Sequence, residues 1–221
     1  MTSGRLARYR HIAIEGVIGA GKTTLARALA SRIGAELLLE QPAENPFLGR
    51  FYADMKGYAF QTQLFFLFQR QKQVQAIAQP TMFASTVVSD FMFAKDAIFA
   101  KLTLSDDEYR LYAQMYAPIA AQLPAPDLVL WLQGEPATLL QRVRRRGIVI
   151  EERIDLDYLE RLADAYAEHF SAADEAPVFA IDTEHFDVLE GSGDLDALVE
   201  ALSRFDARRG RLGGDRQPDL G

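Results

Sequence analysis

One short glycine-rich segment constrains this 221-residue chain more than any other feature of its sequence. Residues 16–23 read Gly-Val-Ile-Gly-Ala-Gly-Lys-Thr and match the pattern G-x-x-x-x-G-K-S/T without a gap. An apolar run at residues 11–15 leads into the segment, and a helical pattern at 23–33 follows it. In such a loop glycines let backbone N–H groups turn towards phosphate oxygens, and the helix N-terminus adds positive potential. The chain is therefore expected to bind a nucleotide through a P-loop.

The P-loop predicts contacts to phosphate and to a metal ion. Lys22 is expected to reach the β- and γ-phosphates, and the Thr23 hydroxyl is expected to ligate Mg²⁺. The other loop residues expected at the triphosphate are Gly16, Gly19, Ala20, Gly21 and Thr24. An ordinary glycine-rich turn with an exposed lysine is the alternative, and the strand and helix beside the loop argue against it.

Composition and charge exclude several other classes of protein. The chain has 24 Lys and Arg against 31 Asp and Glu, and a net charge of −7 argues against wrapping nucleic acid or lying on an anionic membrane. It has no cysteine, which excludes disulfides, thiolate metal sites and cysteine nucleophiles. No apolar run approaches the roughly 20 residues that a membrane span needs. We expect a cytoplasmic protein with neither nucleic-acid nor membrane partners.

Short apolar runs alternate with helical patterns along the chain. The expected strands are residues 11–15, 35–39, 86–90, 127–132 and 178–181, and the expected helices are 23–33, 58–79, 105–122, 137–146 and 157–171. This alternation is typical of an α/β fold, here a five-stranded parallel sheet with helices on both faces. Residues 1–207 are expected to form one domain, and the Gly-, Arg- and Pro-containing residues 208–221 a disordered tail.

A P-loop does not name an activity, so other motifs must separate the classes. The guanine-reading N-K-x-D of GTPases is absent, and the strand that ends at Asp90 continues with Phe91 rather than the Asp-Glu pair of many ATPases. A kinase for a small molecule remains. Glu40 ends the second strand and could accept the proton of an attacking hydroxyl, while Asp90 could hold Mg²⁺. Arginines at 142–146 suit the charge on a transferring phosphoryl group.

Six sequence blocks resemble those of the deoxynucleoside kinases, especially the bacterial deoxyadenosine/deoxyguanosine kinase type. Over about residues 10–186 they read IEGVIGAGKTT, LLLEQPAENPFLGRFY, YAFQTQLFFLFQR, VVSDFMFAKDAIFA, LVLWLQGEPATLLQRVRRRG and DTEHF. The resemblance implies an enzyme of nucleotide salvage that transfers a phosphoryl group from ATP, or another triphosphate, to the 5′-hydroxyl of a deoxynucleoside.

The resemblance also implies roles at the acceptor site. Glu40 matches the carboxylate that takes the 5′-hydroxyl proton, and Tyr52 and Glu151 match the residues that hold the 3′-hydroxyl. The residues matched to base recognition are Gln63, Arg70, Asp96 and, as the aromatic platform, Phe99. Independently of the family, Asp96 lies in an apolar run and a buried acid needs a partner, for which Arg70 is the natural candidate.

A lid at about residues 142–154 is implied in the same way. Arg142 and Arg146 match arginines that clamp the phosphates, and Arg146 and Phe186 match a sandwich around the adenine of the donor. Ile148 stands where many members carry a further arginine, so Arg144 or Arg145 is expected to substitute.

A second departure from the family follows Asp90. Phe91 and Met92 replace its usual Arg-Ser, and an alternative alignment would place Asp90 rather than Asp96 at the base. Asp96 with Arg70 and Gln63 fits a purine or cytosine, and the bacterial character of the blocks favours purines, with deoxyadenosine slightly ahead of deoxyguanosine.

Two other functions stay open on the sequence alone, and so does the oligomeric state. A thymidylate-type nucleoside monophosphate kinase would need extra basic residues at the acceptor, and a catalytically silent regulatory subunit would explain the lost arginine. Residues 65–68 cover most of the circumference of the 58–79 helix, which predicts contact with a second subunit. A homodimer is expected, as is common in the family, or a heterodimer with a paralogous kinase subunit.

Overall fold

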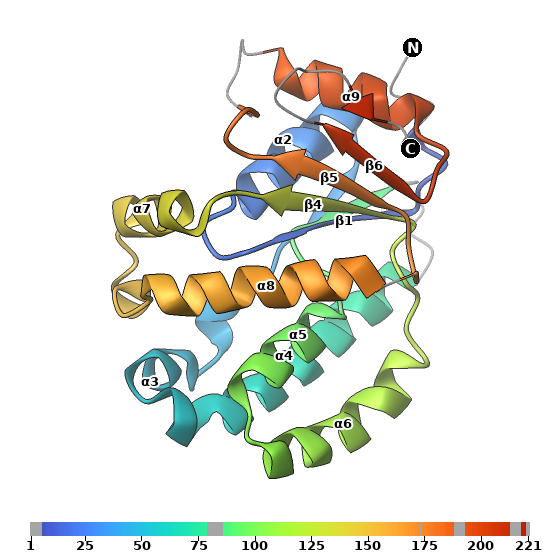
Figure 1. The fold of residues 1–221 in the computed structure, drawn as a ribbon. Helices are drawn as coiled ribbons and strands as arrows, with labels where there is room; N and C mark the ends of the chain where they lie inside the picture. Colours follow the sequence, from blue (N-terminus) through green and yellow to red (C-terminus); the bar gives the residue numbers. More distant parts are fainter. Residues whose placement is uncertain (1–5, 79–85, 173, 188–192, 213–217, 220–221) are drawn as a thin grey trace.

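The computed structural model of the protein describes residues 6–78, 86–172, 174–187, 193–212 and 218–219. Within these residues a single sheet has the strand order β2-β3-β1-β4-β5-β6-β7 (Figure 1). Its strands are β1 (His11–Gly16), β2 (Glu36–Leu38), β3 (Val87–Ser89), β4 (Leu128–Gln133), β5 (Val178–Asp182), β6 (Arg209–Leu212) and β7 (Pro218–Asp219). The first five lie where the sequence predicts strands and all pair in parallel, so the predicted α/β fold is confirmed.

Helices cover both faces of the sheet. They are α2 (Lys22–Ile33), α3 (Leu48–Ala53), α4 (Met55–Ala78), α5 (Lys95–Thr103), α6 (Asp106–Ala120), α7 (Pro136–Arg146), α8 (Leu156–Ala172) and α9 (Asp194–Arg204), with short 3₁₀ turns η1 (Pro42–Glu44) and η2 (Val149–Glu151). Figure 1 shows α2 and α9 on one face and α8, α5 and α4 on the other. All six residues of β1 are buried, as a central strand covered on both faces requires. No helix of the described ranges is long and apolar enough to cross a membrane.

Local signals account for several helix ends. A capping box of Ser105 and Glu108 is present at the start of α6, and Pro136 occupies the first turn of α7. The sequence pattern did not predict α3, α5 or α9, which have 6, 9 and 11 residues. Of these, α3 and α5 are too short to show a strong helical period.

Within the tail, residues 209–212 and 218–219 form strands that the sequence analysis did not predict. Residues 208–221 were expected to be disordered, but β6 pairs in parallel with β5, and β7 pairs with β6 in the opposite direction. The open edge of β5 offers backbone hydrogen bonds that need no apolar pattern in the added strand. Gly210 permits the close approach, since a Cβ there would lie 2.7 Å from the Phe205 ring. The sheet therefore includes strands beyond residue 207.

The direction of the strands determines where the chemistry-bearing residues meet. Because β1, β2 and β3 are parallel, the P-loop after β1, Glu40 after β2 and Asp90 after β3 leave the sheet at the same edge. Open α/β sheets bind ligands at the carboxyl ends of their strands.

Candidate active site

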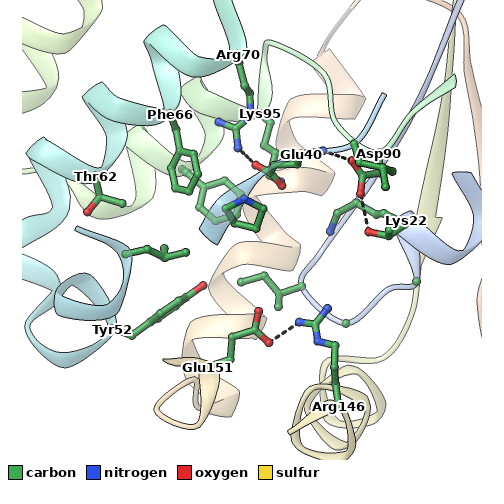
Figure 2. A pocket seen from close by; sticks show the side chains of 18 of the residues that line it. Lys22, Glu40, Tyr52, Thr62, Phe66, Arg70, Asp90, Lys95, Arg146 and Glu151 are labelled. Carbon is green, nitrogen blue, oxygen red and sulfur yellow. Dashed lines mark hydrogen bonds and ion pairs between the residues drawn. The ribbon is translucent and has the colours of Figure 1, made fainter. Parts of the chain in front are cut away.

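A cavity of about 340 Å³ opens at this edge of the sheet (Figure 2). Its walls come from the P-loop, the segment after β2, α3, α4, the start of α5 and the lid. The predicted site residues that line it are Gly19, Gly21, Lys22, Thr23, Thr24, Glu40, Tyr52, Gln63, Arg70, Asp90, Phe99, Arg146 and Glu151. Residues more than 100 positions apart in the sequence thus surround a single space.

Glycine is required in the P-loop by both backbone angle and space. Gly19 and Gly21 have φ values of 88° and 95°, which side-chain-bearing residues rarely adopt. A Cβ at Gly19 would also lie 2.6 Å from the carbonyl oxygen of Leu139 on α7. The Lys22 ammonium donates hydrogen bonds to the carbonyl oxygens of Gly16 at 2.8 Å and Val17 at 3.1 Å. Burial, together with the nearby charge of Lys95, lowers the pKa of Lys22 to about 8.

Asp90 connects the P-loop to the end of β2. Its Oδ2 accepts a hydrogen bond from Thr23 Oγ1 at 2.5 Å, and its Oδ1 accepts one from the backbone N–H of Glu40 at 2.7 Å. A hydroxyl and a carboxylate in contact are hard oxygen ligands of the kind that Mg²⁺ prefers. Because Mg²⁺ commonly takes only one or two protein groups and completes its shell with phosphate and water, these two residues fit such an ion.

Two cations hold the carboxylate of Glu40. Lys95 Nζ lies 2.6 Å from Oε2, and Arg70 Nη2 binds Oε1 (Figure 2). Burial opposes ionisation of Glu40, but the charges of Lys95 and Arg70 outweigh it and hold its pKa well below the usual range. Glu40 is therefore a carboxylate at neutral pH.

Arg70 also binds Asp96 through its other terminal nitrogen, which confirms the pairing predicted from the sequence. Asp96 is fully buried and lies behind Arg70 rather than in the cavity wall. Its Oδ2 has no hydrogen-bond partner among the described residues. Burial raises the pKa of Asp96 to about 7, although the charge of Arg70 opposes the shift.

The rest of the cavity combines aromatic faces with directional polar groups. Phe66 packs under the Arg70 guanidinium, 4.8 Å from ring centroid to Cζ, and Phe99 lines the same space. Gln63 Nε2 donates to Thr103 Oγ1 at 3.3 Å. Tyr52 reaches into the cavity from α3 (Figure 2), and burial raises its pKa well above the usual value. Such walls suit a flat ligand with polar edges.

The lid is only partly in the arrangement that the sequence predicts. Arg146 lines the cavity and forms an ion pair with Glu151, which lies across from Tyr52 (Figure 2). Arg142 instead donates to the side chain and carbonyl of Thr183 after β5, at 3.1 and 2.9 Å. Phe186 packs against the core and does not line the cavity. Gly16 and Ala20 belong to the P-loop, but neither of them lines the cavity.

Sequence reasoning missed Lys95, and it also missed Thr62 and Phe66, all of which line the cavity. A signal for Lys95 was present, since this charged residue stands beside Asp96 in the apolar run FMFAKDAIFA. The argument that a buried acid needs a partner applies equally to a buried lysine.

The phosphate loop and Glu40 line the same cavity, and this fold and site define a P-loop kinase for small molecules. The family model of the deoxynucleoside kinases matches residues 12–205, and the chain belongs to that family. It is accordingly an enzyme, a deoxynucleoside kinase, as the sequence resemblance predicted.

Individual proteins show the same relationship. The chain is 33% identical over 193 residues to a deoxyguanosine kinase of Bacillus subtilis (strain 168), covering 85% of this chain and 93% of that protein. It is 28% identical over 200 residues to the deoxyadenosine/deoxycytidine kinase of the same organism, covering 87% and 91%. A solved deoxyadenosine kinase from M. mycoides with bound dCMP and a flexible dCDP matches with a TM-score of 0.76 and 27% identity, covering 87% of this chain and 98% of that one.

Proposed function

We propose that this kinase transfers the γ-phosphoryl group of ATP, or of another triphosphate, to the 5′-hydroxyl of a purine deoxynucleoside, with deoxyadenosine slightly ahead of deoxyguanosine. The observation that carries the proposal is the position of Glu40, which shares one cavity with Lys22 of the P-loop and with Gln63 and Arg70. The product, a deoxynucleoside 5′-monophosphate, would enter nucleotide salvage in the cytoplasm. The two Bacillus relatives, a deoxyguanosine kinase and a deoxyadenosine/deoxycytidine kinase, support a purine acceptor.

In the proposed reaction Glu40 is the general base. The 5′-oxygen attacks the γ-phosphorus, a new O–P bond forms, and the bond from phosphorus to the bridging oxygen of ATP breaks to release ADP. The hydroxyl proton passes to the Glu40 carboxylate and then to solvent. A carboxylate of low pKa is a weak base, but it suffices because phosphoryl transfer has a loose transition state in which positioning and charge matter most.

Other residues are assigned by the same proposal. Thr23 and Asp90 would hold Mg²⁺, which when bound supplies positive charge to the phosphates. Tyr52 and Glu151 would hold the 3′-hydroxyl. Gln63, Phe99 and Arg70 would contact the base, with Asp96 fixing the orientation of Arg70.

The proposed roles of the lid arginines require both side chains to leave their present partners. Arg146 would leave its ion pair with Glu151, and Arg142 its hydrogen bonds to Thr183, to clamp the phosphates; Arg146 and Phe186 would enclose the donor base. Closure would exclude water, so that the acceptor rather than water takes the phosphoryl group.

A dimer is part of the proposal. Phe68 on α4 and Leu111 on α6 are 47% and 50% exposed, and these two helices contact each other. Exposed large apolar residues on neighbouring helices suit a subunit interface, with a second copy as the proposed partner. Light scattering of the variant Phe68→Lys/Leu111→Lys is expected to give half the mass of the wild-type protein, and an unchanged mass would contradict this interface.

The central test is steady-state phosphorylation with ATP and Mg²⁺ against deoxyadenosine, deoxyguanosine, deoxycytidine, thymidine and dTMP. Purine deoxynucleosides are expected to give the highest kcat/KM. Glu40→Gln should lower kcat by about 10²- to 10⁴-fold with little change in KM for ATP. Glu36→Gln is the matched control, because Glu36 is exposed on β2. Full turnover by Glu40→Gln would exclude Glu40 as the general base. Turnover of dTMP alone would favour a thymidylate-type enzyme.

A further inference from the structure

Lys95 is a buried cation at the start of α5, in the turn that follows β3 and Asp90. Only 7% of the residue is exposed, and that exposed part faces the active-site cavity. Burying an ammonium group costs free energy unless a charge or hydrogen bonds compensate it. The two residues directly after Asp90, Phe91 and Met92, are apolar and buried. Lys95 is the first charged residue of the chain after Asp90.

The backbone of this turn is attached to the P-loop. Glu15, the residue before Gly16, is fully buried, and its Oε1 accepts a hydrogen bond from the N–H of Met92 at 2.8 Å. Its Oε2 accepts one from the hydroxyl of Tyr166 on α8, also at 2.8 Å. The N–H of Lys95 in turn donates to the carbonyl of Met92 at 3.3 Å. The segment that carries Lys95 is therefore held in place by a hydrogen bond to the residue before the first glycine of the P-loop.

The Lys95 ammonium lies in the cavity beside the Glu40 carboxylate and near the Phe99 ring. Its Nζ is 2.6 Å from Oε2 of Glu40 and 5.7 Å from the centroid of the Phe99 ring. In Figure 2 Lys95 and Arg70 approach Glu40 from the side opposite to Asp90 and Lys22. A hydroxyl bound to Glu40 would come within reach of the same ammonium.

Arg70 is less suited than Lys95 to donate a hydrogen bond to the acceptor oxygen during the reaction. Its planar guanidinium is held between two carboxylates, Glu40 at one terminal nitrogen and Asp96 at the other, so the direction of its remaining N–H groups is fixed. An ammonium has three hydrogens, of which the Glu40 contact uses one, so Lys95 can donate to a second oxygen without leaving its partner.

We propose that Lys95 is a second catalytic residue of this site, which donates a hydrogen bond to the acceptor 5′-oxygen as negative charge develops there. The inference rests on the proposed role of Glu40. While the O–P bond forms and the bond to the bridging oxygen breaks, the hydroxyl proton goes to Glu40 and Lys95 keeps all three of its protons. Its charge offsets the anionic carboxylate and phosphates that converge on the oxygen.

The chain's lack of cysteine allows a direct test, because Lys95→Cys introduces the only thiol. This variant is expected to lose about 10²- to 10³-fold in kcat, the range for removing one transition-state donor, with KM for ATP and deoxynucleoside within about threefold. Alkylation with 2-bromoethylamine restores an ammonium at nearly the original position and should recover kcat at least tenfold. Alkylation with iodoacetamide, which adds no charge, should not.

Lys101→Cys is the matched control, because Lys101 lies on the same helix with a side chain that is 60% exposed and paired with Glu168. It should keep wild-type kcat before and after each treatment. If Lys95→Cys does not fold, Lys95→Arg and Lys95→Met replace it, and kcat should be retained within about tenfold only by the arginine variant.

Three results would overturn the inference: wild-type kcat in Lys95→Cys, a loss confined to KM, or a folded, fully alkylated protein that the amine does not reactivate. Glu40→Gln, measured in parallel, separates this inference from the proposed function. An inactive Glu40→Gln with a fully active Lys95→Cys removes only the role of Lys95, whereas a fully active Glu40→Gln removes the general base on which that role depends.

Discussion

Replacing Arg70 with methionine is expected to destabilise the fold through one particular residue, Asp96. Arg70 is 3% exposed and binds Glu40 and Asp96 with its two terminal nitrogens. In the variant Glu40 still has Lys95 as a partner. Asp96, fully buried, has no other ion-pair partner in the described part of the chain. The consequence of Arg70→Met is therefore a buried carboxyl group without a counter-ion.

The size of the effect follows from this geometry. Breaking a buried ion pair by removing one partner costs about 3–5 kcal/mol, a large part of the 5–15 kcal/mol that typically stabilises a domain. The cost depends on pH. Burial raises the pKa of Asp96 from 3.8 to about 7, and losing Arg70, whose charge lowers it, raises it further. Between the unfolded and folded pKa values the native state binds more protons than the unfolded state, so stability falls as pH rises. The penalty should be largest near pH 8 and smaller at pH 5.

Urea denaturation at both pH values provides the assay, with Arg70→Met, Asp96→Asn and the double variant compared with wild type. At pH 8 the double variant is expected to recover at least half of the loss, because asparagine carries no charge to bury. Arg110→Met is the control, since its pair with Asp107 is exposed and should contribute less than about 1 kcal/mol. An equal loss at pH 5 and pH 8, with no recovery in the double variant, would refute the reasoning.

Three further predictions concern the P-loop, the acceptor site and the edge of the sheet. Gly19→Ala should raise KM for ATP at least tenfold, because its φ of 88° and a Cβ 2.6 Å from the Leu139 carbonyl force the loop to move; an unchanged KM would show that the loop tolerates a side chain. Tyr52→Phe should raise KM for deoxynucleosides about 2- to 10-fold, the value of one hydrogen bond, and the effect should vanish with 2′,3′-dideoxynucleosides if Tyr52 binds the 3′-hydroxyl. Truncation after residue 207 should lower the free energy of unfolding by at least about 1.5 kcal/mol, because β6 buries Leu212; full stability of the truncated protein would restore the earlier domain boundary.

Much of the fold follows from patterns that are local in the sequence. The P-loop, the apolar strands and the capping box of Ser105 and Glu108 each depend on residues within a few positions of one another. Such signals act through backbone angles, side-chain period and helix-end hydrogen bonds, so they can be interpreted before any tertiary contact is known. The parallel order of the strands then places Glu40 and Asp90 at the edge where the P-loop lies.

One long-range contact could also be predicted from the sequence, whereas the two ion pairs of Glu40 beside it could not. Asp96 and Arg70 are 26 positions apart, and their pairing follows because a buried acid needs a cation. That argument does not say that the same guanidinium would also bind Glu40, or that Lys95 would take the other carboxylate oxygen from 55 positions away. Which cation reaches which oxygen depends on how α4 and α5 pack beside β2.

The sequence by itself determined the phosphate loop, the parallel α/β fold, the family and most of the residues that line the cavity. Tertiary structure alone decided the two-cation environment of Glu40, the attachment of Arg142 to Thr183 and the addition of β6 to the sheet. The physical reason is the same in each case. Charged side chains and open strand edges accept several partners of equal chemistry, and only the packed chain determines which partner lies within hydrogen-bonding distance.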